Sequence, residues 1–188
     1  MKKSLSAYSE ATTKEQLERH IMVVWVDNEA GVLARVSGLF SGRGYNIESL
    51  TVAQVDEENN ISRITIATNG TNSVIEQIKA QLLKLIPVYK VASFPVDDKS
   101  IFRELALIKV IAEKKNLEKA KEICNSYKAQ YLDTTSTSFI VEFHSTRREI
   151  DRFIKELKPY GIASVARTGP LAMAKGAEIT ESNKGKVI

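Results

Sequence analysis

The sequence predicts an α+β chain made of two tandem ferredoxin-like βαββαβ domains with antiparallel sheets. Two observations support this prediction. Hydrophobic periodicity alternates between that of strands and that of helices in the same order twice, and each pass takes about 75 residues. We expect an N-terminal extension over residues 1–19, a first domain over 20–95, a second domain over 96–168 and a C-terminal tail over 169–188.

The first domain begins with a strand and a helix. Residues 20–26 are almost all β-branched, aromatic or otherwise apolar, which is typical of a strand that is buried on both faces. The turn at 27–31 ends this strand, and the apolar residues that follow at helical spacing predict a helix, which a Gly-Arg-Gly segment stops. Residues 47–55 and 61–68 predict two strands, and the polar loop 56–60 joins them as a hairpin.

The second helix of the first domain is expected to begin at Ser73, which has capping-box spacing to Glu76. Pro87 is expected to end this helix, and residues 88–94 predict the fourth strand. A short polar linker at 95–100 then leads to the second domain. The predicted buried face of the helix comprises Ile75, Ile78, Leu82, Leu85 and Ile86.

The second domain repeats the same order of elements. Residues 103–111 predict a strand that is apolar on both faces, and Asn116 is the expected cap of the helix that follows. Thr146 and Glu149 have capping-box spacing and predict the start of the second helix. The remaining strands are expected at residues 130–135, 138–144 and 162–168.

The first strand of each domain carries apolar residues on both faces. A four-stranded sheet with both helices on one side leaves its other side uncovered, and such a side is normally polar. Burying both sides therefore requires another sheet, from the sister domain or from a second chain, and we expect self-association as a homodimer. In the first strand the two faces are Ile21, Val23 and Trp25 on one side and Met22, Val24 and Val26 on the other.

Composition and charge argue against several functional classes. The chain has 188 residues, 27 Lys+Arg and 23 Asp+Glu, and the cations alternate with acids instead of forming the stripe expected for nucleic-acid binding. No apolar run approaches the roughly 20 residues that span a bilayer, and no apolar stretch follows the basic start as it would in a signal peptide. With a single cysteine as well, we expect a cytoplasmic protein that binds neither membrane nor nucleic acid.

Catalytic residues are scarce in this sequence. His20 and His144 lie in or beside predicted strands, and Cys124 lies on the apolar side of a predicted helix. No spacing typical of a metal site, a phosphate-binding loop or a nucleophile with its base occurs. We therefore expect no catalytic residue and no metal site in this chain, and an enzyme in its own right is disfavoured.

The turn between the first strand and the first helix is the segment most informative about function. Free N–H groups at the start of a helix attract an anion, and Gly31 allows a ligand to approach the backbone. Asn28 offers a donor and an acceptor, and the two apolar residues after Gly31 supply a wall. These groups complement an aliphatic amino acid. A purely structural interpretation, in which Asp27 and Asn28 cap the helix and Gly31 serves the turn, is the stronger one from spacing alone.

Several segments resemble one known family. The Arg-Gly-Tyr-Asn-Ile-Glu-Ser-Leu block is the most specific, whereas the Asn-x-x-Gly turn alone is common to the wider group of ACT domains. On these segments the chain, over about residues 20–175, resembles the small, regulatory subunits of acetolactate (acetohydroxyacid) synthase. The matching segments are residues 27–36, 39–52, 62–66, 76–85 and 103–110.

The resemblance implies a non-catalytic subunit whose first domain is an ACT domain. It implies that valine, or a related branched-chain amino acid, binds at the interface of two ACT domains in a homodimer. It also implies a catalytic large subunit as partner, which would bind thiamine diphosphate, magnesium and FAD, and whose activity this chain would raise and make sensitive to feedback inhibition. The matched ligand-binding residues are Asn28, Ala30, Gly31, Val32 and Leu33 of one chain with Asn46 and Ile47 of the other.

Three alternatives remain open at this point. The chain could be an ACT-type amino-acid sensor for a different biosynthetic enzyme, or a transcription regulator, although no helix-turn-helix segment accompanies the repeats. RNA-recognition modules share the topology, but Asn46 to Glu48 break their Arg-Gly-aromatic signature. Two segments depart from the family. Residues 1–19 precede the first strand, and within them residues 13–19 could form one or two helical turns; the tail from Gly169 matches only loosely.

Overall fold

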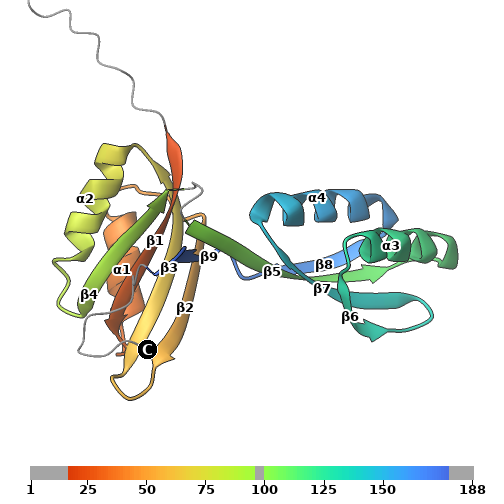
Figure 1. The fold of residues 1–188 in the computed structure, drawn as a ribbon, viewed down its shortest axis with the longest axis horizontal. Helices are drawn as coiled ribbons and strands as arrows, with labels where there is room; N and C mark the ends of the chain where they lie inside the picture. The colour runs from red at the N-terminus through yellow and green to blue at the C-terminus, as the bar shows by residue number, and fades with distance from the viewer. Residues whose placement is uncertain (1–16, 96–99, 178–188) are drawn as a thin grey trace, which may run out of the picture.

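A computed structural model describes residues 17–95 and 100–177 of the chain. It confirms the α+β class and the repeated order of elements (Figure 1). Most of the predicted extension and of the linker lies outside the described residues. The elements of the first domain are β1 (Glu18–Asp27), α1 (Val32–Ser41), β2 (Ser49–Asp56), β3 (Ile61–Gly70), α2 (Asn72–Leu82) and β4 (Val88–Pro95). Those of the second are β5 (Ser100–Ile111), α3 (Lys114–Ser126), β6 (Gln130–Thr134), β7 (Ser138–Ser145), α4 (Arg147–Leu157), the 3-10 turn η1 (Lys158–Tyr160) and β8 (Ile162–Arg167), and the strand β9 (Leu171–Ala174) follows.

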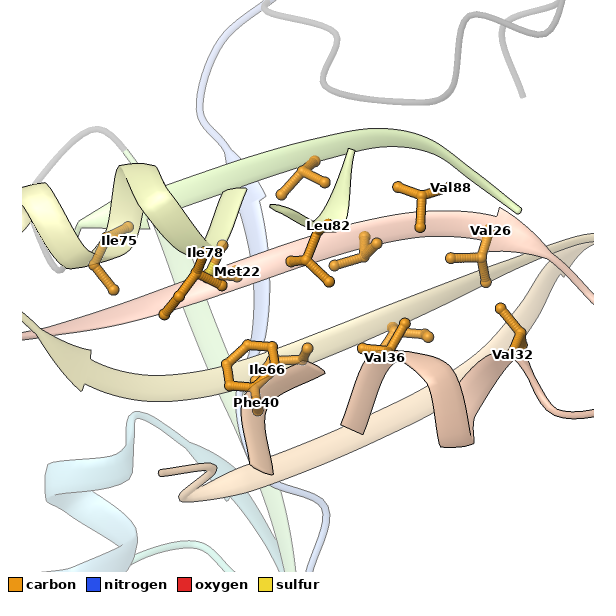
Figure 2. Packing of buried hydrophobic residues seen from close by; sticks show 13 residues of the cluster. Met22, Val26, Val32, Val36, Phe40, Ile66, Ile75, Ile78, Leu82 and Val88 are labelled. Atoms are coloured by element: carbon orange, nitrogen blue, oxygen red, sulfur yellow. The ribbon is translucent and has the colours of Figure 1, made fainter. Parts of the chain in front are cut away.

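The first domain is an antiparallel sheet with strand order β2-β3-β1-β4 and two helices on one face. Because β1 is an inner strand, its alternating side chains are buried on both faces of the sheet. Figure 2 shows the helix-side core, in which α1 and α2 place their apolar stripes on β1 and β3. Each large aliphatic or aromatic side chain buried there contributes about 1.5–3 kcal/mol. The core includes Met22, Val24, Val26, Val36, Phe40, Ile66, Ile78 and Leu82.

Helix α2 differs from its prediction at both ends. Its N-cap is Thr71, whose side chain accepts a hydrogen bond from the N–H of Val74, and the Ser73 hydroxyl forms a hydrogen bond with the hydroxyl of this cap. The prediction of Ser73 as cap was therefore wrong by two residues, because Thr71 already has the extended backbone that a cap requires. The helix ends at Leu82, and Ile86, predicted to lie on the buried face, is 95% exposed.

The second domain has strand order β6-β7-β5-β8. The predicted cap at Thr146 is confirmed, since its side chain accepts a hydrogen bond from the N–H of Glu149 at the start of α4. Helix α3 begins at Lys114, so Asn116 is not its cap, and its N-cap Glu113 makes no side-chain capping bond. The face of this sheet away from the helices stays partly open: Leu105 is only partly buried and Ile111 is 51% exposed.

The chain covers the back of the first sheet with its own residues. The first half of β5 pairs with β9, and this two-stranded ribbon lies against the face that carries Trp25 (Figure 1). Trp25 is 1% exposed and Ala172 in β9 is 2% exposed. The ribbon is fastened further by Arg63, whose guanidinium donates to the carbonyl of Ala172 and lies over the Trp25 ring at 5.6 Å. Two segments were considered as cover for this face of β1, the sister domain and a second chain. The ribbon belongs to the same chain, so burial of this face needs no second copy.

Strand β9 was not expected from the sequence. It lies in the predicted tail, pairs residue by residue with the beginning of β5, and so places the end of the second domain on the back of the first. The helical turns considered for residues 13–19 are not formed where the structure describes this segment, because Glu18 and Arg19 belong to β1. Within the described residues no helix is both long enough and apolar enough to cross a bilayer.

Candidate functional site

The turn that joins β1 to α1 has an unusual helix start. Gly31 is the N-cap of α1 and has a φ of 82°, in the left-handed region that glycine adopts without strain. The N-cap is Gly31 and neither Asp27 nor Asn28, and glycine has no side chain that could cap the helix. Two hydrogen bonds join the turn to the loop between β2 and β3: the N–H of Asn28 donates to the Asn60 carbonyl at 2.8 Å, and the Asn60 side chain donates to the Asn28 carbonyl at 3.1 Å.

The first turn of α1 therefore presents backbone N–H groups. Within the described residues no backbone carbonyl accepts a hydrogen bond from the N–H of Leu33 or Ala34. A Cβ on Gly31 would meet only the Arg35 guanidinium, at 4.0 Å, so the space above the glycine is open. Arg35 itself pairs with Glu29 at 2.9 Å. The turn thus offers unpaired donors, the positive end of a helix dipole and access for an anion.

The predicted apolar wall is only half at the surface. Leu33 is 41% exposed and stands beside the turn, whereas Val32 is 6% exposed and belongs to the helix-side core. Ala30 and Asn28 are exposed. Four of the five predicted residues of this turn are therefore accessible to a ligand. The fifth, Val32, packs in the core and helps to hold α1 on the sheet.

Asn46 and Ile47, the other predicted ligand residues, lie at the opposite end of α1. The Asn46 carbonyl accepts a hydrogen bond from Thr68 Oγ1 at 2.6 Å, and Thr68 pairs with His20 near the beginning of β1. The Gly31 turn follows the end of β1. Helix α1 has 10 residues, which separates the two ends by about 15 Å. One chain therefore does not bring the two predicted groups of ligand residues together.

Strand β2 forms one edge of the first sheet. Val52 and Val55 on this strand are 40% and 37% exposed, and the residues between them are exposed as well. An edge strand with exposed apolar side chains is an open template for pairing with another strand. This edge directly follows the segment that carries Asn46 and Ile47.

The structure places His20, Cys124 and His144 on three different elements, β1, α3 and β7. Burial raises the pKa of the Cys124 thiol to about 11, so this thiol stays protonated and is a poor nucleophile. His20 is 3% exposed with both ring nitrogens unpaired, and His144 lies in β7 of the other domain. Among residues 17–95 and 100–177 no group of three His, Cys, Asp or Glu side chains could hold a metal ion.

Comparisons with known proteins match both domains. A family model described as the AHAS small subunit-like ACT domain matches residues 22–90. A second, described as the small subunit of acetolactate synthase, matches residues 103–176. The second match runs through β9, so the ribbon on the back of the first sheet falls within the matched region.

Relatives of known identity match over most of their length. The chain is 40% identical to the acetolactate synthase small subunit of Mycolicibacterium smegmatis over 84% of this chain and 91% of that protein. It is also 40% identical to the isozyme 3 small subunit of Salmonella typhimurium, over 86% of this chain and 98% of that one. A crystal structure of the small subunit from Thermotoga maritima superposes with a TM-score of 0.78 at 32% identity, covering 84% of this chain and 98% of that one.

Proposed function

We propose that this chain, which belongs to the family of acetolactate synthase small subunits, is the regulatory, non-catalytic subunit of such an enzyme and binds valine or a related branched-chain amino acid. Binding takes place at the interface of two ACT domains in a homodimer. The partner is a catalytic large subunit, and thiamine diphosphate, magnesium and FAD belong to that partner. This chain raises the partner's activity and makes it sensitive to the amino acid.

The observation that carries the interface proposal is the separation of the two groups of ligand residues. The turn at Gly31 and the segment Asn46–Ile47 lie at opposite ends of α1, about 15 Å apart. A two-fold axis perpendicular to α1 reverses the direction of this helix between protomers, and in the dimer that we propose such an axis sets the turn of one chain against the Asn46 segment of its partner. In such an isologous interface each contact occurs twice, and a dimer has two equivalent sites.

The open edge of β2 supports this arrangement. Two copies paired through antiparallel β2 strands satisfy the edge hydrogen bonds and bury Val52 and Val55. The back of the first sheet is unavailable, because the β5–β9 ribbon already covers it. Of the two edge strands of this sheet, β2 and β4, we propose pairing through β2 because it directly follows the Asn46–Ile47 segment.

The chemistry of the turn fits an amino acid with an aliphatic side chain. The carboxylate is the complement of the unpaired N–H groups of Leu33 and Ala34, at the positive end of the α1 dipole. The Asn28 amide and, from the partner, Asn46 supply polar groups for the ammonium. The exposed Leu33 side chain gives the aliphatic part of the ligand a surface to pack on.

Inhibition follows as a coupling between two sites. The amino acid bridges two ACT domains and favours one arrangement of the dimer, while the catalytic subunit is activated by another. A coupling free energy of about 1–3 kcal/mol is enough for a 5–150-fold change in affinity. Because coupling is reciprocal, the amino acid binds the free small subunit and the complex with different affinities.

Calorimetric titration with valine, leucine and isoleucine, repeated in the presence of the catalytic subunit, tests ligand binding directly.

Two variants then test whether sites are shared between chains. Asn28→Ala and Asn46→Ala each damage every site in their homodimers. Unfolded and refolded together, they form heterodimers that keep one intact site, so about a quarter of the wild-type site number returns. Asn125→Ala, at an exposed position of α3, is the control. A mixture that regains no sites contradicts a shared site.

A further inference from the structure

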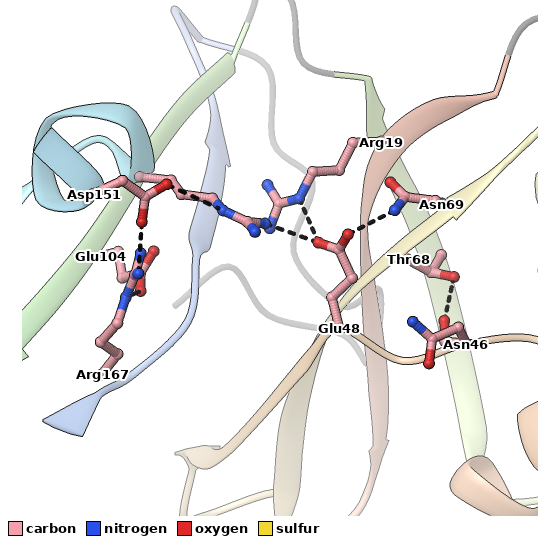
Figure 3. A network of polar contacts seen from close by, with 9 residues as sticks. Arg19, Asn46, Glu48, Thr68, Asn69, Glu104, Asp151 and Arg167 are labelled. Atoms are coloured by element: carbon pink, nitrogen blue, oxygen red, sulfur yellow. Dashed lines mark hydrogen bonds and ion pairs between the residues drawn. The ribbon is translucent and has the colours of Figure 1, made fainter. Parts of the chain in front are cut away.

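Glu48 directly follows the Asn46–Ile47 segment and is held at both its backbone and its side chain. Its N–H donates to the Ala67 carbonyl at 2.8 Å, which ties the segment to β3. One carboxylate oxygen accepts from Asn69 Nδ2 at 2.6 Å. The other accepts from Arg19 Nε and from Arg147 Nη1, each at 2.8 Å (Figure 3). The Glu48 side chain is 21% exposed, so these contacts are shielded from much of the solvent.

Arg147 belongs to the other domain, where it is the first residue of α4. A cation is unfavourable at a helix N-terminus, by about 0.3–1 kcal/mol, because the helix dipole is positive there. Arg147 is compensated by Glu48 from the first domain and by Asp151, one turn along α4, at 3.7 Å. The contact with Glu48 between the domains thus offsets the unfavourable interaction of Arg147 with the dipole of its own helix.

The ion pairs continue into the second sheet. Asp151 accepts a hydrogen bond from Arg167 Nη1 at 2.6 Å, and Arg167 also pairs with Glu104 (Figure 3). Glu104 is 4% exposed and lies in β5, the inner strand to which β7, β8 and β9 all pair. An unbroken series of charged contacts therefore runs from the predicted effector segment to the central strand of the second domain.

The residues after Glu48 also touch the second domain. Thr51 Oγ1 donates to the Thr168 carbonyl at 2.5 Å. A Cβ on Gly169 would lie 2.9 Å from Ser49 Oγ, so the chain at Gly169 passes directly against the start of β2. Beside these contacts the domains are separated by a cleft of about 760 Å³, lined among others by Arg103 and Arg147. The second domain therefore meets the effector segment through polar contacts beside open space, where a small shift costs little packing.

We infer that Glu48 is the positioning residue that couples the Asn46–Ile47 segment to α4, so that an amino acid bound at the segment changes the placement of the second domain. This inference rests on the proposed function. The ligand draws Asn46 and Ile47 toward the partner's turn, Glu48 moves with them, and the Arg147 contact changes. Ligand binding in the first domain thereby changes the position of α4 on the surface of the second domain.

The test uses the full chain and changes Arg147, which leaves the ligand residues untouched. Arg147→Met keeps the aliphatic stem and removes the charge, and Arg147→Lys keeps the charge. Arg152→Met removes a cation of the same helix whose ion pair, among the described residues, is with Glu149 of α4. Valine affinity of the free subunit is measured by calorimetry, and inhibition is measured after reconstitution with the catalytic subunit. Arg147→Met is expected to bind valine within about two-fold of wild type while its inhibition midpoint rises about five-fold or more. Arg147→Lys restores most of the response, and Arg152→Met matches wild type.

A wild-type inhibition curve for Arg147→Met overturns the inference and leaves the proposed function intact. If wild type itself binds no branched-chain amino acid, the proposed function fails, and hydrogen exchange without ligand decides the inference separately. Loss of the Arg147 contact should then speed exchange of the amides of residues 46–49 in Arg147→Met and not in Arg152→Met. Equal exchange in all three proteins overturns the coupling.

Discussion

Replacement of Gly31 by Asp and, in parallel, by Asn tests the anion site in the turn. Gly31 has a φ of 82°, and nothing but the Arg35 guanidinium lies within 4.0 Å of an added Cβ. Asn and Asp tolerate the left-handed region better than other non-glycine residues, so strain costs both variants a similar amount, about 1 kcal/mol. The two side chains have nearly the same shape, and the difference between the variants therefore isolates one negative charge.

The size of the effect follows from the distance between charges. A ligand carboxylate on the N–H groups of Leu33 and Ala34 lies about 5 Å from a carboxylate at position 31, and at an effective dielectric constant of roughly 20 to 80 the repulsion is about 1–3 kcal/mol. That range corresponds to a loss of affinity of about 5–150-fold. Salt weakens this repulsion, because the turn is exposed and the Debye length at 0.15 M is about 8 Å.

Calorimetric titration of both variants with valine at low and at physiological salt measures the difference. Gly31→Asp should bind at least about five-fold more weakly than Gly31→Asn, and added salt should narrow the gap. Thermal unfolding of the two variants should coincide within about 1 °C. Equal valine affinities for Asp and Asn at low salt would refute the argument, because no ligand carboxylate could then lie at this turn.

Three further predictions concern the folded chain. The hydrogen bond from Arg19 is the largest cause that lowers the pKa of Glu48 from 4.5 to about 2. The ionised Glu48 therefore stabilises the fold by on the order of 1–2 kcal/mol after solvent screening; this contribution is complete above about pH 4.5 and is lost as the pH falls toward 2. In urea unfolding across this range, the free energy of unfolding should fall more steeply for wild type than for Glu48→Gln. Ala172→Asp should destabilise the chain by about 3 kcal/mol or more in urea unfolding because it buries a carboxylate against the first sheet, whereas Met173→Asp, on the 56% exposed neighbour, should change it by less than about 0.5 kcal/mol. Thr71→Ala should cost about 1 kcal/mol and Ser73→Ala much less; the reverse order would show that Ser73 is the cap after all.

Local patterns predicted most of the elements. The β-branched run of β1 and the capping box at Thr146 are signals that a few neighbouring residues determine. The predicted cap was wrong where two neighbouring hydroxyl residues could serve, as with Ser73 and Thr71. The backbone conformation decides which of the two is the cap, and residue spacing does not reveal that conformation. Asn116 failed for the same reason: α3 begins two residues earlier without any side-chain cap.

Strand β9 escaped prediction because its existence depends on a distant partner. Its four residues have no periodicity of their own, and they form a strand only by pairing with the start of β5, about 70 residues earlier in the chain. The expectation that both faces of β1 must be buried was correct, but it could not identify the cover. Local alternation shows that a face is apolar and not which segment packs on it.

The candidate site shows the same division. The turn was recognised from its residue types. Its geometry added what the spacing could not, since the N-cap of α1 is Gly31 itself, in the left-handed conformation. Glu48 was noticed only as part of a family motif. Its contact with Arg147 joins residues 99 positions apart in sequence, so no local signal announces it.

Two of the contacts between the domains, at the ribbon and at Glu48, differ in what they can transmit. The β5–β9 ribbon is bound to the first sheet mainly by apolar burial around Trp25, and a close-packed apolar interface resists small displacements. The contact at Glu48 is polar, directional and only one residue from the predicted effector segment. If an amino acid binds at this segment as proposed, we expect it to leave the ribbon in place and to alter the Glu48–Arg147 contact. We then expect the second domain to turn about the ribbon, with α4 as the part that moves most directly against the first domain.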